Sequence, residues 1–376
     1  MKTSSYRDTR AEVRLDDIRY NVAQFKALLK PGVRFMAVVK ADGYGHGAAL
    51  VARAALAAGA TDLGVALLDE ALELVESGIR APILILGHTP VRSLEMAIDH
   101  GIGITVFDEL TLREAIAYAS RLGRTARLHV KVDTGMTRLG VSTPEELVRL
   151  VKLAHSSAAI ELEGVFTHFA DADGESEAYT REQFVRFSAM LAALEREGLR
   201  VPVRHCCNSA ATARYPDMHL DMVRVGIGIY GLLADWLAKP LHLKPAMSFV
   251  TKVTHLLRVP EGSSVGYGRT FFARRDSVIA TLPVGYADGY SRQLSNNGRV
   301  SIGGRTAQVV GRICMDQTMI DVTDLEEVRV GDDALLFGDA LDEGISVFDI
   351  ARSMRSIPHD VLCHVGARVP RMYSEG

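Results

Sequence analysis

A lysine stands at the end of the first strongly apolar run of the sequence. Lys40 follows the run F-M-A-V-V at 35–39 and precedes the glycine-rich segment A-D-G-Y-G-H-G at 41–47. Apolar neighbours lower the pKa of a lysine, and the neutral amine can then attack a carbonyl carbon. The pattern is therefore compatible with a Schiff-base lysine, although a lysine at the end of a strand is more often simply solvated.

Polar or charged side chains also follow four later apolar runs. They are Lys131, Asp133 and Arg138; His168; Asn208 and Ser209; and Arg224 with Gly226 and Ile227. Each has an ordinary alternative, since His168 could be a hydrogen-bonded core histidine, Ser209 a helix N-cap and Arg224 an ion-pair partner. Their shared position at the ends of successive runs favours a common ligand site.

Eight short, β-branched runs alternate with helical patterns between about residues 30 and 230. The runs are apolar on both faces, as parallel strands covered by helices should be, and they are 34–40, 62–67, 82–87, 104–107, 128–133, 162–168, 204–208 and 222–226. Helical patterns between them include 47–59, 109–122, 144–153 and 182–198. Eight alternations predict an α/β fold with a (β/α)8 TIM-type barrel, whose catalytic groups lie at the carboxyl ends of the strands.

The pattern changes near residue 240. Residues 236–260 contain no Asp or Glu, and from residue 247 short alternating runs are separated by glycine turns, at 249–259, 277–283, 300–302, 307–314, 318–322 and 334–337. A helix is expected at 347–355. We therefore predict two domains, a barrel over residues 1–240 and a second, mostly antiparallel β domain over 241–376.

Composition narrows the class of protein. The 376 residues are 48% hydrophobic and 24% charged, as in a soluble globular enzyme. The chain has 43 basic and 46 acidic residues, so no overall positive field favours nucleic acid or a membrane surface as a partner. Four cysteines without a C-x-x-C pair, an N-terminus without an apolar segment and no apolar run of about 18 residues predict a cytoplasmic protein.

The last two barrel runs suggest a phosphate site. Ser209 would open a short helix, and the backbone N–H groups at Gly226 and Ile227 can approach an anion closely. Residues 226–231 match G-x-G-x-x-G, but the acidic residue expected about 20 positions later in a dinucleotide site is missing. The sequence contains no Walker A or H-E-x-x-H motif, so no metal is predicted. A phosphate site, a reactive lysine and a histidine able to stack on a ring predict pyridoxal 5'-phosphate.

Several uncommon strings, in this order, resemble the motif set of bacterial alanine racemases. They are K-A-D-G-Y-G-H-G at 40–47, K-V-D-T-G-M-T-R at 131–138, N-S-A-A at 208–211, V-G-Y-G at 265–268, G-Y-A-D-G at 285–289 and R-I-C-M-D-Q at 312–317. The resemblance runs from about residue 10 to residue 373. It implies an isomerase that interconverts L-alanine and D-alanine for peptidoglycan synthesis, as a homodimer whose sites are shared between chains.

The resemblance also implies a role for each matched residue. Lys40 would hold the cofactor and act as the base on one face of the substrate α-carbon, and Tyr267 would serve the other face. Inversion needs both, because a proton must leave one side and return on the other. The other implied roles are cofactor binding for Tyr44, His168, Asn208, Ser209, Arg224, Gly226 and Ile227, substrate binding for Arg138 and Met315, and support from Lys131, Tyr286, Cys314 and Asp316.

Three features of the sequence allow more than one interpretation. The residue matched by Lys131 carries a carbamate in part of the family, which would pair with Arg138; an ordinary ion pair with Asp133, or a solvated lysine, is the alternative. His359 stands where the family usually has a tyrosine near the cofactor phosphate, so alanine-only specificity is less secure. A racemase of broader scope, a related lyase and a non-catalytic cofactor carrier are the alternative functions. The motif around Cys314 and the presence of a second domain argue against the last two.

Overall fold

The computed structural model describes residues 6–234, 236–237, 241–338 and 344–375. Contacts divide the chain into two units. The first consists of Ile18–Gly43 and Ala48–Leu243, and the second of Met1–Asp17, Tyr44–Gly47 and Lys244–Gly376. Compared with the expected division into 1–240 and 241–376, the N-terminal residues lie with the second unit, because their strand pairs within its sheet.

Eight parallel strands form the sheet of the first unit. In chain order they are β2 (Arg34–Val38), β3 (Asp62–Val65), β4 (Ile83–Ile85), β5 (Gly103–Val106), β6 (Ala126–Lys131), β7 (Ile160–Phe166), β8 (Val203–His205) and β9 (Met222–Val225). From β2 to β8 each strand pairs with the next along the chain, and β9 pairs with β2. The N–H of Arg224 donates to the carbonyl of Cys207 over 2.9 Å, which joins β9 to the end of β8. The predicted barrel and its eight strands are confirmed.

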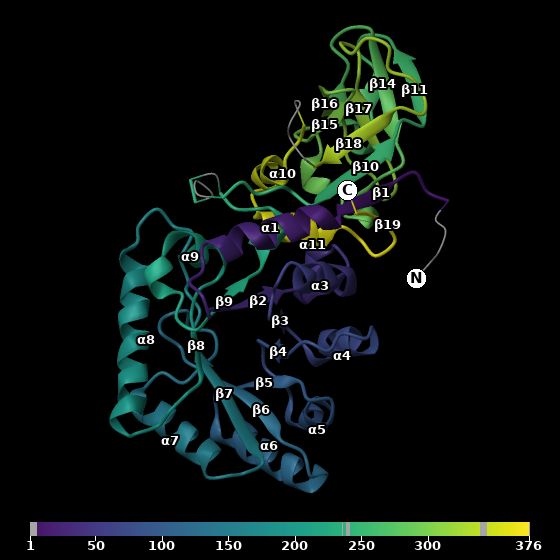
Figure 1. Cartoon of the computed structure of the whole chain (residues 1–376). Coiled ribbons are helices and arrows are strands. Elements are labelled where there is room, and N and C mark those ends of the chain that lie inside the picture. Colours follow the sequence, from purple (N-terminus) through teal and green to yellow (C-terminus); the bar gives the residue numbers. More distant parts are fainter. Residues whose placement is uncertain (1–5, 235, 238–240, 339–343, 376) are drawn as a thin grey trace. The chain divides into compact units, whose positions relative to one another are not determined.

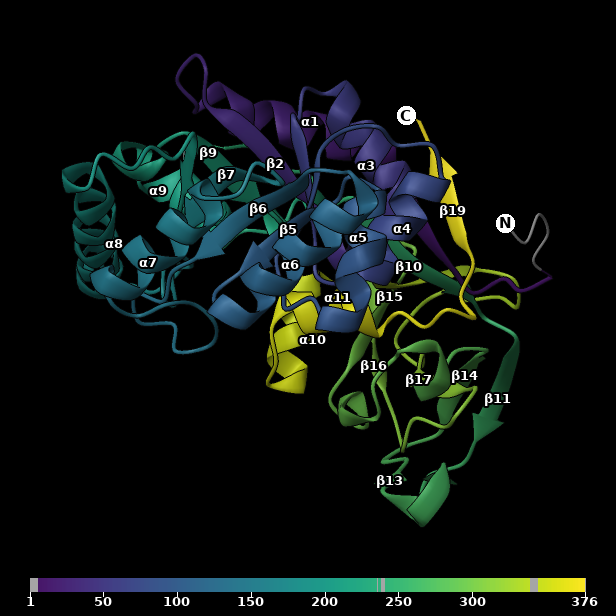
Figure 2. The same cartoon turned by 90° about the horizontal axis from the view of Figure 1, so that it is seen from below.

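Helices lie outside these strands (Figures 1 and 2). They are α3 (Ala48–Ala57), α4 (Leu68–Glu76), α5 (Leu94–Asp99), α6 (Glu109–Leu122), α7 (Pro144–His155), α8 (Ala178–Arg196) and α9 (Ser209–Arg214), with α1 (Leu15–Ala27) preceding β2. Local signals explain two of them. Asp108 caps α6 by accepting from the N–H of Thr111, and Gly123 ends it at a φ of 60°. Thr143 and Glu146 form a capping box on α7. Within the described residues, no helix is long and apolar enough to span a membrane.

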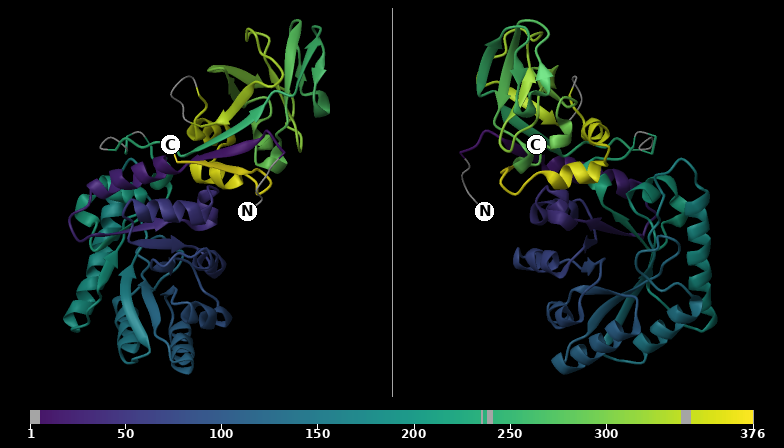
Figure 3. Two further views of the ribbon diagram at one scale, coloured as in Figure 1. Left: turned by 45° about the vertical axis from the view of Figure 1, so that its right-hand side comes forward. Right: turned by 180° about the vertical axis from the view of Figure 1, so that it is seen from behind.

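The second unit is built on a nine-stranded sheet, seen from two further directions in Figure 3. Its strands are β1 (Arg10–Arg14), β10 (Met247–Lys252), β11 (His255–Val259), β14 (Ser277–Leu282), β15 (Arg299–Ile302), β16 (Arg305–Val309), β17 (Thr318–Asp321), β18 (Asp333–Phe337) and β19 (Arg371–Ser374). All neighbours are antiparallel except β1 and β19. A hairpin of β12 (Ser264–Val265) and β13 (Phe271–Phe272) and the helices α10 (Val347–Met354) and α11 (Pro358–His364) complete the unit.

The structure corrects three details of the predicted strands. The run 249–259 is two strands, because β10 pairs with β1 and β18 whereas β11 pairs with β14. The run 307–314 ends as a strand at Val309, since Gly311 turns the chain at a φ of 74°. Strands β1 and β19 were not predicted, although Ala11 and Val13 alternate as fully buried residues along β1.

Candidate active site

Lys40 begins a left-handed turn at the carboxyl end of β2. The turn α2 (Lys40–Tyr44) has φ values of 52° at Ala41, 52° at Asp42 and 61° at Gly43. Left-handed backbone costs a non-glycine residue about 1–2 kcal/mol, so neighbouring groups must hold it. The Asp42 carboxylate does so by accepting from the N–H of Ala48 over 2.8 Å. Strain of this kind concentrates at functional sites, which supports the prediction for Lys40.

Glu70 is a second support for this turn. Its Oε1 accepts from the N–H of Ala41 over 2.7 Å, and its Oε2 accepts from the N–H groups of Ala66 and Leu67 at the start of α4. One carboxylate thereby connects the residue after Lys40 to the loop after β3. Sequence reasoning missed Glu70, which reads there as an ordinary acidic residue in the first turn of a helix.

Arg224, on β9, is buried and surrounded by acceptors. Its Nη2 donates to the carbonyls of Thr167 and Cys206, over 2.8 and 3.1 Å, and lies 3.3 Å from His168 Nδ1. Its Nη1 lies 3.0 Å from His205 Nδ1. Burial lowers the pKa of Arg224 to about 10, so the guanidinium still carries its charge at neutral pH. The structure brings Arg224 and His168 together, as their shared rim position predicts.

Four cations lie close enough to His168 to act on its titration. Burial lowers the pKa of His168 well below its ordinary value, and the charges of Arg224, Lys131, Arg138 and Lys40 lower it further. His168 is therefore neutral at pH 7. Two arginine and two lysine side chains around one neutral ring suit an anionic ligand, since a nearby negative charge stabilises their protonated forms.

Lys131 lies inside the barrel at the end of β6. Its Nζ is 4.3 Å from the centre of the Phe166 ring. Burial lowers its pKa well below the ordinary value, and the charges of Arg224 and Arg138 lower it further. Asp133 is the ion-pair partner that the sequence offers for Lys131. One oxygen of its carboxylate accepts from the N–H groups of Gly135 and Thr137.

The segments that follow β8 and β9 are joined by one hydroxyl group. Ser209 Oγ accepts from the N–H groups of Gly226 and Gly228, over 2.9 and 3.2 Å. Asn208 caps α9 by accepting from the N–H of Ala211, and Ile227 begins a 3-10 turn after Gly226. Asn208 thus caps the short helix, whereas Ser209, its first residue, joins it to the glycine segment.

Two neighbouring cysteines follow β8. Cys206 and Cys207 are fully buried, and both thiols donate to the carbonyl of Met218, over 3.1 and 3.2 Å.

Tyr267, Tyr286 and Met315 lie on turns of the second unit. Tyr267 begins a 3-10 turn between β12 and β13, and 70% of its surface is exposed. The N–H of Tyr286 donates to the carbonyl of Cys314 over 3.1 Å, so the segments of Tyr286 and Met315 are neighbours. A Cβ at Gly285 would lie 2.3 Å from the Cys314 carbonyl oxygen, so only glycine fits there.

Arg368 ties these two turns together. It donates to the buried carboxylate of Asp288, two residues after Tyr286, and to Asp316, the residue after Met315, over 2.6 Å each. Arg7 donates to Asp288 as well. Burial alone would raise the pKa of Asp288, but these hydrogen bonds outweigh it and lower the pKa. Sequence reasoning assigned Asp316 a supporting role but missed Asp288 and Arg368, because only the fold brings them together.

Tyr44 and His359 are neighbours, with ring centres 5.9 Å apart. His359 lies on α11, whereas Tyr44 is the last residue of the left-handed turn. The residue that departs from the family pattern therefore contacts a residue predicted to bind the cofactor phosphate.

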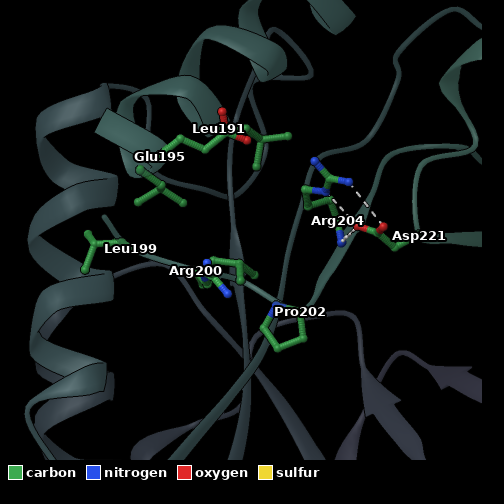
Figure 4. Close-up of a pocket in the computed structure, with 9 residues that line it drawn as sticks. Leu191, Glu195, Leu199, Arg200, Pro202, Arg204 and Asp221 are labelled. Atoms are coloured by element: carbon green, nitrogen blue, oxygen red, sulfur yellow. Dashed lines mark hydrogen bonds and ion pairs between the residues drawn. The ribbon is translucent and has the colours of Figure 1, made fainter. Parts of the chain in front are cut away.

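A pocket of about 480 Å³ lies elsewhere, between the end of α8 and the start of β8 (Figure 4). Arg204 and Asp221 form an ion pair on one wall, over 2.7 Å, and Leu191 and Leu199 lie on the other. The pocket is at the amino end of β8, whereas the groups described above follow the carboxyl ends of the strands. It therefore does not belong to the candidate site.

Comparison with known proteins shows the family of this chain. Residues 13–234 match the family described as "Alanine racemase, N-terminal domain", and residues 246–373 match "Alanine racemase, C-terminal domain". Alanine racemase 2 of Oceanobacillus iheyensis is 50% identical, over 99% of this chain and 95% of that protein.

Two solved structures extend the likeness to the fold. The alanine racemase of a D-cycloserine-producing Streptomyces lavendulae superposes with a TM-score of 0.94 at 37% identity, over 99% of this chain and 98% of that one. The alanine racemase of Bacillus anthracis with bound L-Ala-P gives a TM-score of 0.93 at 38% identity, over 99% and 96% of the two chains. The present chain belongs to the alanine racemase family.

Proposed function

We propose that this protein is a pyridoxal-phosphate-dependent racemase that interconverts L-alanine and D-alanine. The observation that carries the proposal is the buried Arg224 beside His168, within reach of the charges of Lys40, Lys131 and Arg138. Family membership over nearly the whole chain supports the same reaction. A solved relative is described with bound L-Ala-P, which supports a site for a small amino acid.

The residues present fit pyridoxal phosphate. The donor set combines an amine at Lys40, a neutral ring at His168, a cation that can only donate at Arg224, and the hydroxyl of Ser209 next to the N–H groups of the glycine segment. When bound, this cofactor supplies an electron-withdrawing ring that stabilises negative charge at the substrate α-carbon.

Arg224 would face the ring nitrogen. A guanidinium has only N–H donors and stays protonated at neutral pH, so it gives the nitrogen a hydrogen bond without transferring a proton. By leaving the ring nitrogen unprotonated, Arg224 would restrain the electron withdrawal that the cofactor supplies, compared with a carboxylate at the same place. Arg224 would thereby favour return of the proton to the α-carbon, and so racemisation over transamination.

The remaining residues bind the anions and move the proton. Ser209, Gly226, Ile227 and Tyr44 would hold the phosphate, with His359 beside Tyr44. Asn208 would position Ser209, and Arg138 and the N–H of Met315 would hold the substrate carboxylate. Lys40 Nζ and Tyr267 Oη would exchange the α-proton on opposite faces, because inversion requires a group on each side. Tyr286 would line the entrance.

We propose a cytoplasmic homodimer in which the second unit of one chain completes the site of the other. Tyr267, Tyr286 and Met315 support this proposal, since 70%, 42% and 54% of their respective surfaces are exposed in the single chain. Exposed tyrosine and methionine side chains are typical of surfaces that become buried in an assembly.

Substrate scope tests the proposed reaction directly. We expect the enzyme to racemise L-alanine faster than L-serine, L-lysine or L-arginine, by about tenfold or more, because a single extra group in a closed pocket costs roughly 1–3 kcal/mol. Chiral chromatography of each product measures the rates. A preference for serine or a basic amino acid would replace this assignment with a racemase of broader scope.

Lys131 is the proposed site of a carbamate. The lowered pKa of Lys131 favours its neutral amine, which can add carbon dioxide and release a proton to the solvent. The resulting carbamate anion would pair with Arg138. We expect 13C from labelled bicarbonate to appear on the wild-type protein and not on Lys131→Met. Lys131→Glu, which keeps a negative charge, should retain about tenfold more activity than Lys131→Met. Equal losses in both variants, or the absence of label from the wild type, would contradict the carbamate.

A further inference from the structure

A chain of polar side chains, buried at Arg224, His205 and His129 and partly exposed at its far end, leads away from Arg224. Arg224 Nη1 lies 3.0 Å from His205 Nδ1, and His205 Nε2 lies 3.0 Å from His129 Nδ1. His129 Nε2 then lies 3.5 Å from Glu163 Oε2. The other oxygen of Glu163 accepts from Nε and Nη2 of Arg127, over 2.9 and 2.5 Å. Strands β9, β8, β6 and β7 each contribute to this chain.

The groups at the two ends of this chain, Arg224 and Glu163, determine which nitrogen of each histidine donates and which accepts. Arg224 has no acceptor, so His205 Nδ1 must accept, and the proton of a neutral His205 must be on Nε2. That proton is donated to His129 Nδ1, which leaves the proton of His129 on Nε2. Nε2–H then faces a carboxylate, which can only accept. Every pair therefore matches a donor with an acceptor, provided that both histidines are neutral.

Burial keeps both rings neutral. It lowers the pKa of His205 well below its ordinary value, and the neighbouring charge of Arg224 lowers it further. Burial lowers the pKa of His129 as well, more than Glu163 raises it. Neither ring is expected to hold a second proton at pH 7.

The packing around the rings fits a fixed arrangement. Phe166 stacks on His205, with ring centres 4.7 Å apart and planes within 7°. Gly164 lies opposite His129 on the neighbouring strand, where a Cβ would lie 2.4 Å from His129 Nδ1. The pairing between β6 and β7 shifts between Leu128 and His129, at this same place. Any side chain at position 164 would displace the ring from His205.

We propose that Glu163 and His129 are positioning residues for racemisation, which fix the proton positions on both histidines and so keep an acceptor on Arg224. The effect on the rate rests on the role proposed above for Arg224. The proton positions themselves do not, since they follow from the protein's own hydrogen bonds.

Glu163→Gln offers a test at nearly constant size. Arg127 can only donate, so the amide oxygen of the new side chain would accept its hydrogen bonds. The amide NH2 group would then point toward His129 Nε2. His129 would then carry its proton on Nδ1, and His205 likewise. Two N–H groups would meet between His205 and Arg224, and that hydrogen bond would be lost.

The experiment combines nuclear magnetic resonance and kinetics on the holoenzyme. Two-bond 1H–15N correlations of the histidine rings should show His129 and His205 protonated on Nε2 in the wild type and on Nδ1 in Glu163→Gln. The kcat for alanine should fall about tenfold or more, as for loss of one charge-assisted hydrogen bond, while KM stays within about twofold. Glu161→Gln, an exposed change on the same strand, is the matched control and should alter neither.

A second substitution provides a rescue. In Arg127→Met with Glu163→Gln, the amide oxygen is free to turn and accept from His129. We expect Nε2 protonation to return and most of the lost kcat with it. Wild-type protonation in Glu163→Gln, reversed protonation without a change in kcat, or failure of the double variant to recover would each overturn the proposal. The ring spectra remain readable in a protein without pyridoxal phosphate, so failure of the proposed function would be recognised separately.

Discussion

Tyr267→Phe is expected to lower the racemisation of alanine by about 10²–10⁴-fold, the usual contribution of a positioned acid–base group. The exposed turn that carries Tyr267 should keep its structure, since the change removes only the hydroxyl group. Cofactor content should therefore stay at the wild-type level. Polarimetry or coupled assays in both directions measure the loss, and absorbance measures the cofactor.

The exchange of the α-proton separates this role from a general loss of activity. Lys40 is intact in Tyr267→Phe. The variant should therefore still exchange the α-proton of one enantiomer with solvent, the one whose α-proton faces Lys40, and should lose exchange of the other enantiomer. Tyr118→Phe, a tyrosine of α6 that packs against Arg121, serves as a control and should behave as wild type. Undiminished exchange from both enantiomers in Tyr267→Phe would refute a two-base reaction that uses this residue.

Lys40→Ala should lower turnover by about 10⁴-fold or more. Alanine provides neither the covalent attachment of the cofactor nor a base for the α-proton. Borohydride treatment of the wild type should fix the cofactor on the peptide that contains Lys40, and the variant should lose it on dialysis. Lys152→Ala removes an exposed lysine paired with Glu197 and is the matched control. Recovery of the reduced cofactor on any other lysine would overturn the assignment of Lys40.

The sequence was sufficient to predict the barrel because its strands are local, continuous apolar runs. Each predicted run from 34–40 to 222–226 overlaps an observed strand, β2 to β9. The N-terminal strand β1 was missed because five alternating residues carry a weak signal, and its partners β10 and β19 lie more than 230 residues away in the chain. Such long-range pairing leaves no local pattern.

The candidate site was predictable to the extent that its residues follow strands or form uncommon motifs. Lys131, His168 and Arg224 were found in this way, and the charges of Lys131 and Arg224 both act on His168. Supporting residues were not found, because their partners are set by the fold. Glu70 reads as a helix-start residue, and Arg368 reads as part of a basic tail. Glu163 shows its relation to Arg224 only through two histidines from other strands.

Deuterium exchange in D2O is the most direct test of the central claim. The holoenzyme is incubated separately with L-alanine and D-alanine, and 1H nuclear magnetic resonance follows the α-proton of each enantiomer after chiral separation. The account predicts that deuterium enters the α-position of both enantiomers and that each product formed carries it, because the proton leaves to one group and returns from another. Product that keeps its original α-proton, or exchange confined to one enantiomer in the wild type, would contradict a two-base alanine racemase.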